Sequence, residues 1–180
     1  TFENADTAAV FGLAKACGSR DFALIVGSLA FDVADTTQDW KRNCNDVTFN
    51  GRIDSKRHFI TSAALQAASN KGVAVSLGEF KELYDTISGA GGLDFTDIAA
   101  NLSGIRLSNT FMKTPPGDWP GLLARLAREN DVIVPFDGIP QIMTEGAFKD
   151  AYSDVGSAAY VAELAKIEAK IDRLAVHKAP

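Results

Sequence analysis

Carboxylate, histidine and amide side chains recur at helical spacing in the middle of this chain. Asp54 and His58 are four positions apart, so they share one face of a helix. Asp97 and Asn101 have the same spacing further along. Carboxylates and a histidine held on facing helices can act as general acids and bases, or can bind a metal ion. The spacing therefore predicts a polar site built by helices.

A second pair of carboxylates lies between these two segments. Glu79 and Glu82 are three positions apart, and Glu79 has a glycine before it and a phenylalanine after it, which favours partial burial. A partly buried carboxyl keeps its proton to a higher pH, as a general acid requires. The candidate catalytic residues are Glu79, Asp97 and His58. The candidate substrate-binding residues are Asp54, Asn101 and Glu82.

Most of these side chains also have a structural interpretation. Asp54 is a suitable N-cap, and Asp94 or Asp97 can cap the following helix. His58 can be satisfied between packed helices, and Glu82 can be a solvated surface residue. The sequence alone does not decide between the structural and the functional interpretations. They are linked, because helices that converge would join most of these residues in one network.

Three predicted helices position the polar residues. The first runs from residue 54 to about 70, the second from about 73 to 88, and the third from a cap at Asp94 or Thr96 to about 111. Glycines at 72 and 89–92 separate them. Helices joined by such short breaks pack as antiparallel neighbours. We therefore expect their polar faces to converge.

The N-terminal segments are predicted to be helical as well. Apolar positions after Asp6 and Thr7 indicate a short helix that ends near Gly18. Residues 22–35 form a strongly apolar and therefore central helix. Residues 36–53 are polar and are predicted to be a long loop, of the kind that is often functional or cross-linked.

The C-terminal part differs in character. Residues 121–130 are predicted to be helical, and Val132-Ile133-Val134 is the strand-like run of the sequence. Residues 157–176 have the spacing of an amphipathic helix, which packs against the domain or binds a partner helix. His177 is expected in a mobile terminal tail. We expect an all-α, compact multi-helix bundle with long loops: a helical core domain at 1–114 that carries the polar motif, and an irregular C-terminal extension at 115–180 packed on it.

Composition limits the classes of partner. The chain has 180 residues, which suits one domain, a net charge of −5 and a pI of about 5.0. Phosphate binding needs a concentrated basic surface, so no nucleic-acid partner is expected. The longest apolar stretch, residues 22–33, contains Asp32 and is shorter than the roughly 18 residues that span a bilayer. We therefore do not expect the chain to span a membrane.

The two cysteines, Cys17 and Cys44, are either free buried thiols or a disulfide, and we expect the disulfide. Such a bond closes a loop of 27 positions and contributes roughly 3–4 kcal/mol in the chain-entropy model. It also implies an oxidising compartment. The first residue is Thr1 instead of methionine, which suggests a trimmed chain or a mature exported protein. The predicted location is the periplasm or the extracellular space.

The order of the polar residues also resembles that of known bacterial proteins. It runs as Asp54-Ser-Lys-Arg-His58-Phe59, then Glu79-Phe-Lys-Glu82-Leu-Tyr-Asp85, then Asp97-Ile-Ala-Ala-Asn101-Leu-Ser-Gly104. This order is similar to the signature shared by YfiM-like envelope lipoproteins and VanZ-like membrane proteins, which usually have glutamine where Glu82 stands. The resemblance spans residues 54–108. It implies an envelope or exported location and a shared polar site, without a particular reaction.

Three functions follow from these observations. The first is an exported hydrolase of cell-envelope or extracellular glycans, with Glu79 as general acid and Asp97 or Asp94 as the second carboxylate. His58 and Asn101 would orient the substrate. A glycan or another cell-envelope ligand is then the expected partner, and no cofactor is required.

The other two functions do not involve carboxylate catalysis of this kind. His58, Glu79 and Asp97 have the ligand chemistry of a manganese, iron or calcium site. Alternatively, the chain is a non-enzymatic envelope protein whose polar network is structural. In that case the loop at 36–53 or the terminal helix binds the partner.

Overall fold

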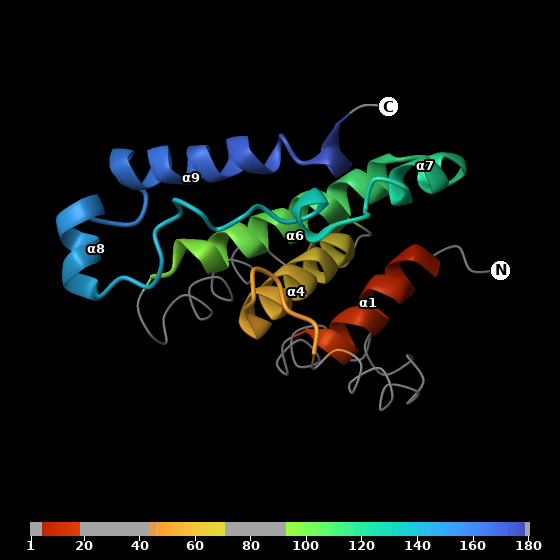
Figure 1. Cartoon of the computed structure of the whole chain (residues 1–180), viewed down its shortest axis with the longest axis horizontal. Helices are drawn as coiled ribbons and strands as arrows, with labels where there is room; N and C mark the ends of the chain where they lie inside the picture. The colour runs from red at the N-terminus through yellow and green to blue at the C-terminus, as the bar shows by residue number, and fades with distance from the viewer. Residues whose placement is uncertain (1–4, 19–43, 45, 71–92, 179–180) are drawn as a thin grey trace.

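The computed structural model of the chain describes residues 5–18, 44, 46–70 and 93–178 (Figure 1). Within these ranges the regular secondary structure is helical, apart from two isolated β-bridges, Phe49 with Arg52 and Leu93 with Met143. The expected all-α fold class is thereby confirmed. None of the helices in these ranges combines the length and the apolar character that a membrane-spanning segment needs. The predicted helices at 22–35 and 73–88 lie outside the described residues, as does most of the predicted loop at 36–53.

Helices α4 (Ile53–Asn70) and α6 (Phe95–Lys113) form the central pair (Figure 1). The first and last residues of both helices agree with the sequence prediction to within two residues. Side chains that meet across the interface advance together along both helices, from His58 with Asp97 to Ser62 with Asn101. The two helices therefore run parallel.

The two helices come closest where Gly104 of α6 meets the backbone of Phe59 of α4. A Cβ at Gly104 would lie 2.9 Å from the Phe59 carbonyl carbon and closer still to its oxygen, which no side chain tolerates. Glycine is therefore required for this approach. Ala99, Ala100 and Ser103 of α6 are also buried, so small side chains occupy much of the packed surface of this helix.

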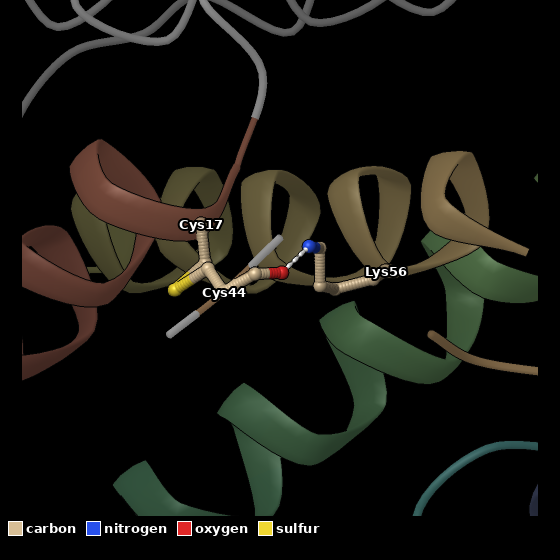
Figure 2. Close-up of a disulfide and its surroundings, with 3 residues drawn as sticks. All are labelled: Cys17, Cys44 and Lys56. Carbon is tan, nitrogen blue, oxygen red and sulfur yellow. Dashed lines mark hydrogen bonds between the residues drawn. A yellow bond between two sulfur atoms is a disulfide. The ribbon is translucent and has the colours of Figure 1, made fainter. Parts of the chain in front are cut away.

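Helix α1 (Ala5–Cys17) packs against α4 and is joined to the chain before α4 by a disulfide. The Cys17–Cys44 bond confirms the predicted pairing, with 5.2 Å between the two Cα atoms. Figure 2 shows the Lys56 side chain of α4 directed at the backbone of Cys44, where its Nζ donates to the carbonyl oxygen. Lys56 is 3% exposed, and burial lowers the pKa of its ammonium group. Covalent and polar contacts thus fix Cys44 between α1 and α4.

The chain after α6 is made of short helical pieces and one longer helix. They are η2 (Pro116–Asp118), α7 (Trp119–Leu123), η3 (Glu129–Asp131), α8 (Glu145–Tyr152), α9 (Ala158–Ile171) and η4 (Ala175–His177). Helix α9 lies along α6 on the side away from α4 (Figure 1). Ser157 caps it, as its position before the amphipathic run suggests, and Ile167 and Ile171 are 1% exposed. The predicted amphipathic helix thus packs against the protein, although it ends at Ile171 rather than near residue 176.

Three C-terminal predictions were wrong. Residues 121–130 are not one helix, because α7 ends at Leu123 and only η3 follows. The Val132–Val134 run is not a strand. Ile133 and Val134 are fully buried, so their apolar character reflects core packing of an irregular segment. His177 is not in a free tail, since η4 places it against α6 and its Nδ1 lies 2.8 Å from the Thr110 hydroxyl.

Candidate functional site

A tight turn places Arg52 at the start of α4. Asn50 and Gly51 have φ values of 51° and 73°, and Phe49 and Arg52 exchange two backbone hydrogen bonds across them, at 3.0 and 2.9 Å. Asn-Gly is the residue pair that favours this left-handed turn. The Asn50 side chain also donates to the Val134 carbonyl at 3.1 Å, which fixes the turn on the C-terminal part of the chain. The guanidinium of Arg52 is therefore held in one place.

Arg52 binds side chains from the starts of both central helices. Its Nε and Nη2 donate to the two carboxylate oxygens of Asp54 at 3.0 and 2.7 Å. Its Nη1 donates to Asp94 at 3.0 Å and to the hydroxyl of Thr96 at 2.6 Å. Its Nη2 also donates to Asp97 at 3.0 Å. We call these five residues, Arg52, Asp54, Asp94, Thr96 and Asp97, the Arg52 network.

The start of α6 contributes the buried side of the network. Asp94 is the N-cap of α6, because its side chain accepts from the backbone N–H of Thr96 at 2.8 Å. The Thr96 hydroxyl donates to the same carboxylate at 2.6 Å while it accepts from Arg52. Asp94 is 6% exposed and Thr96 is fully buried. The capping role predicted for Asp94 is confirmed, and the cap is also an ion-pair partner.

Asp97 joins the network to His58. One of its carboxylate oxygens binds Arg52, and the other lies 3.5 Å from His58 Nε2. Burial raises the pKa of Asp97, and the nearby Asp94 carboxylate adds to this effect, whereas His58 and Arg52 oppose it. One guanidinium among three carboxylates leaves an excess of negative charge. A proton held by Asp97 relieves this excess.

Asp54 behaves in the opposite way. Its two oxygens form a bidentate pair with Arg52, and this hydrogen bonding holds the pKa of Asp54 below its usual range. Asp54 is not the N-cap of α4, because the helix begins at Ile53 and Asp54 belongs to the first turn. Its oxygen also accepts from the backbone N–H of Ser55 at 2.8 Å, so it satisfies a free donor at the helix start.

The structure thus brings together three of the six predicted site residues, Asp54, His58 and Asp97. Asn101 lies one turn further along α6, where it accepts a hydrogen bond from Ser62 at 2.7 Å and is 2% exposed. Glu79 and Glu82 lie outside the described residues. Their roles as general acid and substrate-binding residue therefore stay predictions.

Arg52 is the residue that the sequence analysis missed. It is the centre of the cluster, yet its position at the end of a polar segment suggested only a loop. The Asn50-Gly51 pair directly before it was the available signal, because it predicts a tight turn that fixes the next residue. In the described part of the chain, no three histidine, cysteine or acidic side chains are arranged to hold a metal ion.

Comparison of the chain with protein-family models, curated proteins and solved structures finds no significant match. The resemblance of residues 54–108 to YfiM-like and VanZ-like proteins stays a prediction. The function is therefore argued from the geometry of the described residues.

Proposed function

We propose that this chain is an exported, non-enzymatic binding protein of the cell envelope or extracellular space, and that the Arg52 network stabilises its fold. The observation that carries this proposal is the complete use of the Arg52 guanidinium. An arginine side chain has five N–H donors. In Arg52 the five hydrogen bonds to Asp54, Asp94, Thr96 and Asp97 engage all of them. No donor is left for an anionic substrate.

The network connects two segments of the chain that are distant in sequence, residues 52–54 and 94–97. Asp54 belongs to α4, Asp94 and Asp97 belong to the start of α6, and Arg52 belongs to the turn before α4. Removing one partner from a buried ion pair leaves an uncompensated charge, which costs about 3–5 kcal/mol. Because the Arg52 side chain is 26% exposed, we expect a smaller loss of about 2–4 kcal/mol.

Urea unfolding of Arg52→Met tests the structural role. The variant should lose about 2–4 kcal/mol of unfolding free energy, whereas Arg173→Met, which removes an exposed arginine, should change it by less than about 0.5 kcal/mol. Asp97→Asn should cost less, because its amide oxygen still accepts from Arg52 and burial already raises the pKa of the Asp97 carboxyl. Unchanged stability in Arg52→Met would rule out the structural role, since residues of a working site are often dispensable for folding.

The disulfide supports the exported location. Such bonds persist in oxidising compartments and are rare in a reducing cytosol. Cell fractionation followed by thiol labelling under denaturing conditions tests this point. We expect the protein in the envelope or external fraction with both cysteines unlabelled until a reductant is added. A cytosolic protein with two reactive thiols contradicts the location.

One observation favours a hydrolase as the second candidate. Asp97 has a raised pKa and faces His58, and their side chains are 24% and 15% exposed, so a proton can exchange with solvent. This pair would supply the second carboxylate and its orienting histidine, with Glu79 as the general acid. Hydrolysis of a glycan panel that is lost in both Glu79→Gln and Asp97→Asn would establish this candidate, and no turnover by the wild-type protein would eliminate it.

A further inference from the structure

An apolar cavity of about 350 Å³ lies beside the α4–α6 pair, further along both helices than the Arg52 network. Twelve residues from α1, α4, α6 and α7 line it, and eleven of them are apolar. The remaining one is Ser108. Protein interiors have few voids larger than a water molecule. A cavity of this volume in so small a protein is therefore a candidate binding site.

The packing of α4 and α6 explains why the cavity exists. The two helices are held in backbone contact at Gly104 and Phe59. Beyond this contact, α4 presents Ala63 and Ala67 to the cavity. These side chains are too short to fill the space that α6, α1 and α7 enclose. Small side chains of α4 thus leave a space beside the point where Gly104 brings the two helices together.

The cavity is open to solvent at its rim. Leu13 of α1 is 44% exposed and Leu123 of α7 is 53% exposed, and both line the cavity. Large apolar side chains at the mouth of an apolar cavity give a small molecule a path from water to the interior. Exposed apolar surface of this kind commonly marks a binding site.

The chemistry of the lining selects an apolar occupant. Among the described residues that line the cavity, none is charged. The indole N–H of Trp119 is already used, because it donates to the Thr114 carbonyl at 3.0 Å. A polar group placed inside would lose its hydrogen bonds to water and find little in return, which costs about 1–3 kcal/mol. The occupant must therefore be uncharged and largely hydrocarbon or aromatic.

The size of the cavity favours a small molecule over a protein segment. Small-molecule sites have volumes of about 300–1,000 Å³, and apolar cavities of about 150 Å³ already bind benzene. A stable protein interface needs about 20–30 residues on each side. The twelve residues of this cavity are too few for that.

We propose that the cavity lined by Ala63, Ala67, Phe111 and Trp119 binds a small, uncharged apolar molecule. This inference deepens the proposed binding function by naming the class of ligand, and it rests on that proposal. The two can fail separately, because Arg52→Met tests the network and the cavity variants below test the ligand.

Fluorescence titration with the uncharged probe N-phenyl-1-naphthylamine tests the proposal. We expect saturable binding of one probe per chain and displacement by 1-decanol. Ala67→Leu fills the cavity with a larger apolar side chain and should weaken probe binding about ten-fold, because it displaces several apolar contacts of the ligand. Ala165→Leu makes the same change at an exposed position of α9 and should bind like the wild type.

A second variant, at the rim of the cavity, keeps the proposal testable if Ala67→Leu fails to fold. Leu123→Glu places a charge at the exposed mouth, where the fold tolerates it, and should also weaken binding about ten-fold. Probe affinity within two-fold of the wild type in both variants would overturn the proposal. So would probe release by phosphatidylglycerol vesicles together with vesicle binding of the protein, which indicates a membrane surface as the occupant. Concentration-dependent dimers that Leu123→Glu abolishes would overturn it too, because the cavity would then be an interface between copies.

Discussion

Lowering the pH should weaken the packing of the C-terminal residues against α6. Protonation of a single histidine, His177, should cause this effect. The Thr110 hydroxyl has the Arg106 carbonyl within reach at 3.0 Å as an acceptor for its hydrogen, and in that arrangement its oxygen accepts from His177 Nδ1 at 2.8 Å. Neutral His177 therefore carries its proton on Nδ1. Its Nε2 is buried and, within the part of the chain that the structure describes, has no hydrogen-bond partner. Protonation would place a charged N–H in this unfavourable position.

The size of the effect follows from the pKa. Burial lowers the pKa of His177 from 6.5 to about 4, and the positive charge of Arg106 adds to this, while Asp172 opposes it. Because the folded pKa is depressed, the stabilisation is present above pH 6.5 and is lost as the pH falls toward 4. The shift corresponds to at most about 3.4 kcal/mol. The ring is only half-buried, so screening by solvent reduces the expected loss to about 1–2 kcal/mol.

Urea unfolding of wild type and His177→Asn at pH 7 and pH 4.5 measures this loss. Other groups titrate in both proteins, so the difference between them isolates His177. The wild type should lose about 1–2 kcal/mol more than the variant, or about 3–6 °C in Tm. NMR titration of the two histidine rings gives the pKa directly, and the variant identifies the His177 signal. A His177 pKa near 6.5, or equal losses in both proteins, would refute the tautomer argument.

Two further predictions concern the central helices and the disulfide. Gly104→Ala should lower the unfolding free energy by about 2–3 kcal/mol, because its Cβ would collide with the Phe59 backbone. In Gly121→Ala the new Cβ meets nothing within 4 Å, so equal thermal melts of the two variants would contradict the close-approach argument. Removing the Cys17–Cys44 bond with a double serine substitution should cost about 3–4 kcal/mol in urea unfolding. A loss below about 1 kcal/mol would show that the contacts of α1 with α4 hold the helix without the bond.

The helices that carry the site were predictable because local signals define them. The Asp94 cap, the glycine at 72 and the apolar periodicity placed α4 and α6 within two residues of their observed ends. Asp54 and His58, which share one helix face, are expected from the sequence to approach Asp97 if the helices converge, and both lie near Asp97 in the structure. Cysteine number and loop length favoured the disulfide that the structure contains.

The features that the sequence analysis missed or predicted wrongly share one physical cause. Tertiary contacts determine them, and local sequence patterns do not reveal those contacts. Arg52 became the centre of the network because a turn aims it at α6, and periodicity carries no information about that direction. Ile133 and Val134 are as buried as residues of a central β-strand, but they have no partner strand among the described residues. A short apolar run in a sequence does not distinguish a buried strand from a buried irregular segment. His177 is near the chain end, yet Thr110 anchors it.

The disulfide also has a topological consequence. The bond from Cys17 to Cys44 makes residues 17–44 a closed covalent ring, of which α1 is an exocyclic branch. A single proteolytic cut at any peptide bond inside the ring gives two fragments that the disulfide still joins, so α1 is not released. The wall that α1 contributes to the apolar cavity, Val10 and Leu13, therefore stays covalently attached to α4 after such a cut. Further cuts inside the ring remove only the residues between them, and a reductant is needed in addition to one such cut to separate α1 from α4.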